Sequence, residues 1–160
     1  MNKEITINGE KYIKAECEEC KEKKSPYEFK NGDEYYILTA SGKTSKHYWD
    51  NYTIEKWGVT LGKIFRTKKE AEHERDKREA IFKIKKYIYD NFGYDPTDWA
   101  DWEDTYRRKY QIVYDCNINR FENIGGFNRV YSPIGYLKTK EQGKVIIDNF
   151  EDELRIIFSI

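Results

Sequence analysis

Two cysteines at C-x-x-C spacing, Cys17 and Cys20, are the first residues whose chemistry has to be considered. This spacing occurs in redox motifs and in one half of a structural zinc site. The other soft ligands are Cys116, His47 and His73, and no second pair at short spacing is found among them. We therefore interpret both cysteines as free thiols on a polar segment, and we predict neither a metal site nor a cofactor.

Candidates for acid–base catalysis are few, because the chain contains only two histidines. Neither histidine lies near a Gly-x-Ser-x-Gly elbow, a P-loop or a His-Glu-x-x-His motif. An enzyme would need a pocket that gathers distant side chains such as His47, Asp50 and Tyr110, which sequence spacing does not reveal. We predict that the protein is not an enzyme.

An acidic loop with two tryptophans is the first candidate binding site. Tryptophans three residues apart can lie on one side of a helical turn, and a tryptophan surrounded by charges is typical of an interface hot spot. The carboxylates could also hold a hard cation, but the spacing and the glycine of an EF-hand are absent. The alternative is that both tryptophans fill the core. The candidate partner-binding residues are Asp98, Trp99, Asp101, Trp102, Glu103 and Asp104.

A basic segment precedes this loop. Residues 61–90 carry ten basic and six acidic side chains, a net charge of +4, whereas residues 91–104 carry a net charge of −5. The basic side chains could meet phosphates or an acidic protein surface, with Tyr48, Trp49 and Tyr52 nearby as stacking rings. The alternative is a charged helix that is simply solvated. The residues proposed for nucleic-acid or acidic-surface binding are Lys63, Arg66, Lys68, Lys69, Arg75 and Arg78.

The composition limits the class of protein that can carry these candidates. The chain has 160 residues, 29 basic and 29 acidic, so neither a uniformly basic nucleic-acid coat nor an acidic DNA mimic is expected. Hydrophobic residues make up 38% and aromatic residues 16%, so the core must depend on aromatic rings. No run approaches eighteen apolar residues, and residues 1–10 lack the apolar stretch of a secretory signal. We expect a cytoplasmic protein.

The elements that position the candidates begin with a short hairpin. Two β-prone runs in residues 5–13 flank Asn8-Gly9, the dipeptide preferred in type I′ turns. Residues 14–24 are polar throughout and predict a solvated linker or a short frayed helix. Three β-prone runs follow, at residues 34–40, 47–54 and 57–65, and together they predict a three-stranded meander.

A long helix is expected next. Thr67 and Glu70 have the spacing of a capping box, which places the helix start at Lys68. Helical spacing of apolar residues continues to residue 91 or 92, and Gly93 lies where a left-handed C-terminal residue is expected.

The same order of elements returns in the second half. Strands are predicted at residues 109–116, 127–131 and 135–138, with a turn-rich excursion at residues 117–126 between the first two. Thr139 and Gln142 repeat the capping spacing, and a helix is predicted over residues 140–158.

Residues 64–71 align without gaps on residues 136–143, so we interpret the chain as an internal duplication. The predicted fold class is α+β, with two duplicated antiparallel β-meander-plus-helix units preceded by an N-terminal β-hairpin. The predicted segments are residues 1–30 for the hairpin and polar linker, 31–93 for the first unit and 94–160 for the second, packed as one compact body.

Three stretches carry a resemblance to known proteins: Glu34-Tyr35-Tyr36-Ile37, residues 62–72, and a series running from Trp99 to Glu141. They resemble uncharacterised small proteins encoded by phages and prophages of low-GC Gram-positive bacteria, over roughly residues 34–158. The resemblance implies a mobile-element setting, where small neutral cytoplasmic proteins include inhibitors of host defence such as anti-CRISPR proteins. It transfers no site residues.

From the resemblance and the absence of catalytic motifs, we expect a non-enzymatic protein that binds and inhibits a host-defence effector, such as a Cas nuclease. The alternative is a nucleic-acid-binding accessory protein that uses the basic helix.

Overall fold

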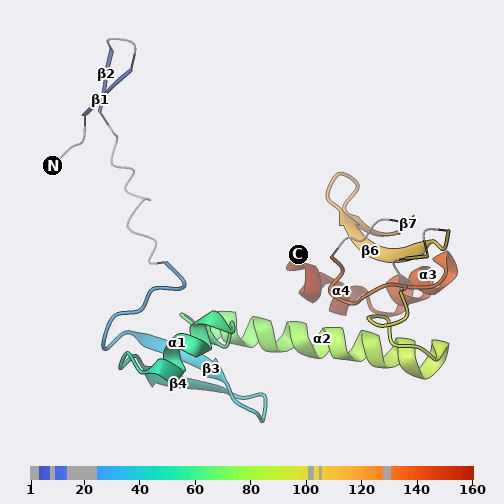
Figure 1. Ribbon diagram of the computed structural model, residues 1–160, viewed down its shortest axis with the longest axis horizontal. Helices are drawn as coiled ribbons and strands as arrows, with labels where there is room; N and C mark the ends of the chain where they lie inside the picture. The colour runs from blue at the N-terminus through green and yellow to red at the C-terminus, as the bar shows by residue number, and fades with distance from the viewer. Residues whose placement is uncertain (1–3, 8–9, 14–24, 101–102, 105, 128–130) are drawn as a thin grey trace.

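The structure is a computed structural model of the chain, and it describes residues 4–7, 10–13, 25–100, 103–104, 106–127 and 131–160 (Figure 1). It has an α+β fold with four helices and small antiparallel sheets. The elements in chain order are β1 (Glu4–Ile7), β2 (Glu10–Ile13), β3 (Glu34–Leu38), β4 (Thr44–Tyr48), α1 (Thr53–Thr60), β5 (Ile64–Phe65), α2 (Lys68–Phe92), β6 (Lys109–Asp115), β7 (Arg120–Gly126), α3 (Lys140–Asn149) and α4 (Glu151–Phe158).

The predicted N-terminal hairpin is confirmed. Strands β1 and β2 pair antiparallel, with Ile5 opposite Tyr12 and Ile7 opposite Glu10. The predicted turn at Asn8-Gly9 lies outside the described residues. The predicted linker at residues 14–24, with Cys17 and Cys20, lies outside the described residues.

The part of the first unit that precedes α2 consists of β3, β4, α1 and β5, and the three-stranded meander predicted here is wrong. The strand order is β4-β3-β5, so the third strand pairs with β3 and not with its predecessor β4. Helix α1 takes residues 53–54 of the predicted strand 47–54 and residues 57–60 of the predicted strand 57–65, and only residues 47–48 and 64–65 of these two runs are strand. The Glu55 carboxylate accepts the backbone N–H of Tyr52 at 2.7 Å, which satisfies an otherwise unpaired group at the helix start.

Helix α2 begins and ends where the sequence predicts. The Thr67 hydroxyl accepts from the Glu70 N–H at 3.2 Å, and the Glu70 carboxylate accepts from the Thr67 N–H at 3.0 Å. Gly93 ends the helix with φ of +73°. The 25-residue helix is about 38 Å long and reaches from the β4-β3-β5 sheet to the second unit (Figure 1).

The second unit consists of β6, β7, α3 and α4, and four of its predicted segments need correction. The excursion predicted at residues 117–126 is largely strand β7, because Asp115 and Asn119 close a tight turn. The described part of residues 127–131 is not strand, and the run 135–138 contributes only one bridge, between Leu137 and Tyr110. The predicted helix over residues 140–158 is interrupted at Phe150, whose φ is −133°.

The main hydrophobic core lies in the second unit and the C-terminal half of α2. Ile84 and Ile88 of α2 pack with Ile112 of β6, Phe121 of β7 and Leu154 of α4. The first unit has a smaller aromatic centre, in which Phe29 stacks on Trp49 at 4.9 Å and Tyr35 meets both rings edge-on. The expectation that the core depends on aromatic rings holds for this smaller centre, whereas the buried residues of the main core are mostly isoleucine and leucine.

The two strand-to-helix junctions share their pairing. Phe65 pairs with Tyr36 in the first unit, and Leu137 pairs with Tyr110 in the second. Thr139 accepts from the Gln142 N–H just as Thr67 accepts from the Glu70 N–H. The described residues between β7 and Leu137 form no counterpart of α1. Duplication of a common unit therefore stays a prediction.

Among the described residues, no helix is long and apolar enough to cross a membrane.

Candidate functional site

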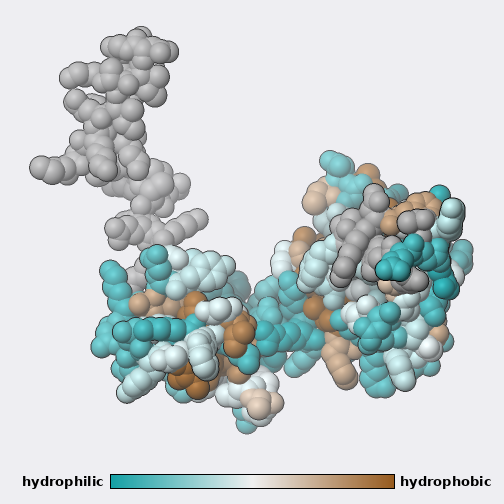
Figure 2. Space-filling model, viewed as in Figure 1, coloured by the Kyte–Doolittle hydropathy of each residue, from teal (hydrophilic) through white to brown (hydrophobic). Residues whose placement is uncertain are grey.

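Helix α1 presents an apolar surface to solvent in the first unit. Ile54, Trp57 and Leu61 are 76%, 65% and 63% exposed, and they follow one another at spacings of three and four residues. This spacing places them on one side of the helix, and we call the three residues the α1 face. Figure 2 shows hydrophobic side chains gathered at the surface of this unit. Exposed large apolar side chains in a contiguous patch mark interaction surfaces.

A groove of about 410 Å³ lies between the α1 face and the sheet. Gly58 lets α1 approach the sheet closely, because a Cβ at this position would lie 2.7 Å from the Ile64 Cδ1. The groove, which we call the α1 groove, is lined by Tyr35, Ile37, Leu38, His47, Ile54, Glu55, Trp57, Gly58, Leu61, Lys63 and Ile64.

The one carboxylate in the α1 groove is already engaged. Glu55 is 5% exposed, and it accepts from the Tyr35 hydroxyl and from the backbone N–H groups of Asp50 and Tyr52. Burial of Tyr35, followed by its hydrogen bond to Glu55, raises the pKa of the Tyr35 hydroxyl to about 12. The phenol therefore stays neutral at physiological pH.

The groove also contains the polar side chains of His47 and Lys63. The His47 ring stacks on Tyr35 at 5.6 Å, and its Nε2 lies 3.1 Å from the Ser45 hydroxyl. Lys63 makes no ion pair with any residue that the structure describes. The α1 groove therefore has a mainly apolar lining, with the ammonium group of Lys63 beside it.

Trp99 of the acidic loop packs against the second unit. Its indole N–H donates to the Tyr136 carbonyl, and its ring meets Tyr94 edge-on at 5.8 Å. The guanidinium of Arg107 lies over the same ring, 5.4 Å from its centroid. Of the two roles weighed for this tryptophan, the structure shows contacts of the packing kind.

The described carboxylates of the acidic loop differ in exposure and in hydrogen bonding. Asp98 and Glu103 are exposed, whereas the Asp104 carboxylate closes a turn by accepting the backbone N–H groups of Tyr106 and Arg107. Asp101 and Trp102 lie outside the described residues. Partner binding by this loop stays a prediction.

Most members of the basic set are engaged within the chain. The Arg66 guanidinium lies over the Phe29 ring at 4.2 Å and donates to the Ser25 carbonyl and to Asp33. Three other members of the basic set form ion pairs on α2: Lys68 with Glu72, Arg75 with Asp76, and Arg78 with Glu74. Lys63 and Lys69 are exposed.

The stacking rings expected beside the basic set also differ in exposure. Tyr48 and Tyr52 are exposed, whereas Trp49 is buried in the aromatic centre of the first unit.

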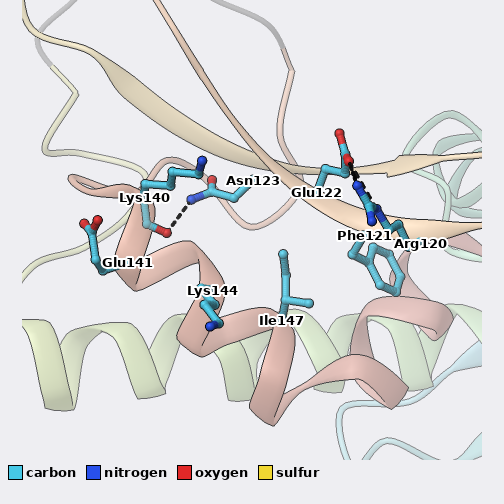
Figure 3. Close-up of a pocket in the computed structure, with 8 residues that line it drawn as sticks. All are labelled: Arg120, Phe121, Glu122, Asn123, Lys140, Glu141, Lys144 and Ile147. Carbon is cyan, nitrogen blue, oxygen red and sulfur yellow. Dashed lines mark hydrogen bonds and ion pairs between the residues drawn. The ribbon is translucent and has the colours of Figure 1, made fainter. Parts of the chain in front are cut away.

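A second cavity, of about 550 Å³, lies between β7 and α3 (Figure 3). Asn123 donates to the Lys140 carbonyl at 2.8 Å, and Arg120 pairs with Glu122 at 2.7 Å. Lys140 and Lys144, four residues apart on α3, both line this cavity (Figure 3). The Glu141 pKa is lowered by its own backbone N–H and the Thr139 hydroxyl, so this carboxylate stays charged and offsets one lysine.

Three of the residues considered for metal or acid–base chemistry, His47, His73 and Cys116, lie within the described residues, and they are on separate elements. His73 lies on α2, with its Nε2 3.0 Å from the Ser159 hydroxyl. His47 lies on β4, and Cys116 is exposed in the β6–β7 turn. Within the described part of the chain, no group of three His, Cys, Asp or Glu side chains could hold a metal ion.

Sequence reasoning missed the α1 face because Ile54 and Trp57 are β-prone residue types. The signal that could have found it is the helical spacing of Ile54, Trp57 and Leu61, together with Glu55 at the third helical position.

A scan against protein-family models gives no match for this chain, and searches of curated proteins and of solved structures return no relative.

Proposed function

We propose that this chain is a non-enzymatic protein-binding protein whose contact surface is the α1 face and the α1 groove. The observation that carries this proposal is the exposure of three large apolar side chains in one line beside an apolar groove. Leaving such side chains in water forgoes the stabilisation of burying them, about 1.5–3 kcal/mol each. A partner that covers them recovers this free energy, and tryptophan is the residue most typical of interface hot spots.

The biological role that we propose is inhibition of a host-defence effector in the cytoplasm of the host cell, with a Cas nuclease as one candidate. Its support is the resemblance to phage and prophage proteins together with the binding surface. A plaque assay tests it with a phage that expresses this protein, on hosts with and without a matching CRISPR–Cas system. Compared with the same phage lacking the gene, a gain in plaques on the CRISPR–Cas host alone supports the Cas assignment, and no gain on either host contradicts it.

The binding surface has its own test. Tagged wild-type protein and a Trp57→Ala variant are purified from infected host cells, and co-purifying proteins are quantified. Because Trp57 is 65% exposed, the substitution leaves the melting temperature within a few degrees. We expect the partner to be lost from Trp57→Ala.

The matched control is Phe82→Ala, which removes an equally exposed aromatic ring from α2 and should keep the partner. Equal recovery of the partner with both variants would contradict the proposed surface.

A further inference from the structure

The sheet of the first unit is only partly covered on the side that α1 occupies. Tyr35 lies beneath the start of α1 and is 7% exposed, because its hydroxyl reaches the buried Glu55. Ile37, two residues further along the same face of β3, lines the open α1 groove together with Ile64. The eight residues of α1 thus cover one end of this sheet face and leave the other end to the groove.

The sheet has two edge strands, β4 and the two-residue β5, and addition of a further strand at the β4 edge is disfavoured. Strand β4 forms that edge, and the middle of β4 carries Lys46, which pairs with Glu34 of β3 at 2.6 Å. A lysine on an edge strand opposes pairing with a further strand. In a two-fold dimer through β4, the two copies of Lys46 would also face each other, and like charges opposed across strands are destabilising.

A helix laid beside α1 fits the uncovered face instead. Helices packed side by side on one face of a sheet form the ordinary layer arrangement of α+β proteins. The α1 face would meet one side of such a helix, while Ile37 and Ile64 would meet its underside. An amphipathic helix bound in an apolar groove is an established mode of protein recognition.

The charged side chains of the groove favour a partner helix that carries negative charge. Glu55 is saturated by three donors, so the groove has no unengaged carboxylate to receive a basic partner. Lys63 provides an ammonium group at the groove, and His47 adds no negative charge. Complementarity therefore requires a carboxylate on the partner beside its apolar stripe.

We propose that the occupant of the α1 groove is an acidic amphipathic helix of a protein partner, which lies beside α1 and places an Asp or Glu against Lys63. This inference rests on the proposed protein-binding function and adds the chemistry of the partner segment.

The test replaces Trp57 with the photoreactive residue p-benzoylphenylalanine in the full chain, and cross-links it in infected host cells. The cross-linked segment of the partner is then mapped by mass spectrometry. The same replacement at Phe82 is the control. We expect the Trp57 position to label a segment with apolar residues at helical spacing and with adjacent Asp or Glu residues.

A second arm tests the charge. Lys63→Glu should reduce the Trp57 cross-link by about tenfold, because it places like charges together at the groove. Lys56→Glu, at an exposed lysine of α1 outside the groove, makes the same charge change and should leave the yield within about twofold.

The outcomes separate the two proposals. A protein cross-linked at Trp57 through a β-prone or basic segment overturns the acidic helix and leaves the protein-binding function standing. Cross-links to nucleic acid, to a second copy or to residues 4–13 of this chain overturn both. A yield at Trp57 no higher than at Phe82 also overturns both.

Discussion

Single residues show how burial decides the role of an aromatic side chain in this protein. Trp49 and Trp57 are eight positions apart, yet Trp49 is buried in a ring cluster and Trp57 is largely exposed. Tyr35 is buried because its hydroxyl has a partner in Glu55, which lets a polar group leave water without losing its hydrogen bond. Two predictions belong to this scale.

The first concerns Tyr35. Its pKa of about 12 in the folded protein lies above the value of about 10 expected for an unfolded chain. A raised pKa means that the contribution of the neutral phenol to stability is complete below pH 10 and is lost as the pH rises to about 12. We expect the free energy of unfolding to fall less steeply over this range in Tyr35→Phe than in wild type. Denaturant titrations from pH 9 to pH 12 measure it, and parallel slopes would contradict it.

The second concerns Trp99. Its ring packs on Tyr94 and its N–H is bonded to a backbone carbonyl, so Trp99→Ala should lower the free energy of unfolding by about 3 kcal/mol. Asp98→Asn, at the exposed neighbouring residue, should change it by less than about 0.5 kcal/mol. Urea denaturation of both variants gives the comparison. A Trp99→Ala protein as stable as wild type would return Trp99 to the list of interface anchors.

At the scale of elements, the second unit is held by contacts between loops as well as by its helices. The Tyr136 N–H donates to the Pro96 carbonyl at 2.8 Å, which joins the loop after α2 to the loop before α3. Gly135 makes this approach possible. It has φ of +87°, and a Cβ there would lie 2.3 Å from the Pro96 oxygen.

Gly135→Ala should therefore cost about 3 kcal/mol or more of stability, because it adds a backbone clash to the strain of a positive φ. Gly32→Ala is the matched control. Gly32 has nearly the same φ, +85°, but open space around it, so only the strain of about 1–2 kcal/mol applies. Thermal or urea unfolding measures both variants, and equal losses would show that the contact with Pro96 adds nothing.

At the scale of the whole molecule, α2 links two units with different surfaces. Its first half is charged and polar at the surface in Figure 2. The basic side chains there are largely paired with acidic neighbours, as Arg75 is with Asp76 and Arg78 with Glu74. Such pairing reduces the charge that a phosphate backbone would meet.

We therefore expect no salt-sensitive binding of duplex or single-stranded oligonucleotides tighter than about 1 μM near physiological ionic strength. Fluorescence anisotropy at two salt concentrations measures this. Tighter binding that weakens steeply with salt, and that is lost in a Lys63→Glu and Lys69→Glu double variant, would favour the nucleic-acid alternative over protein binding.

The features predicted correctly from sequence are those set by neighbours in the chain. The capping pairs at Thr67 and Thr139 and the left-handed Gly93 need only residues a few positions away. The residue types at these positions determine the local backbone, so helix starts and the end of α2 follow directly from the sequence.

Only the tertiary structure decided which surfaces are buried. The pairing of β5 with β3 joins residues that are 27 to 29 positions apart. Residues 53–60 form a helix whose buried Glu55 accepts from the hydroxyl of Tyr35 on β3, 20 positions away. A β-prone run such as this one takes the conformation that its partners favour. The exposure of the α1 face was likewise set by the tertiary structure, because residue type alone does not distinguish the buried Trp49 from the exposed Trp57.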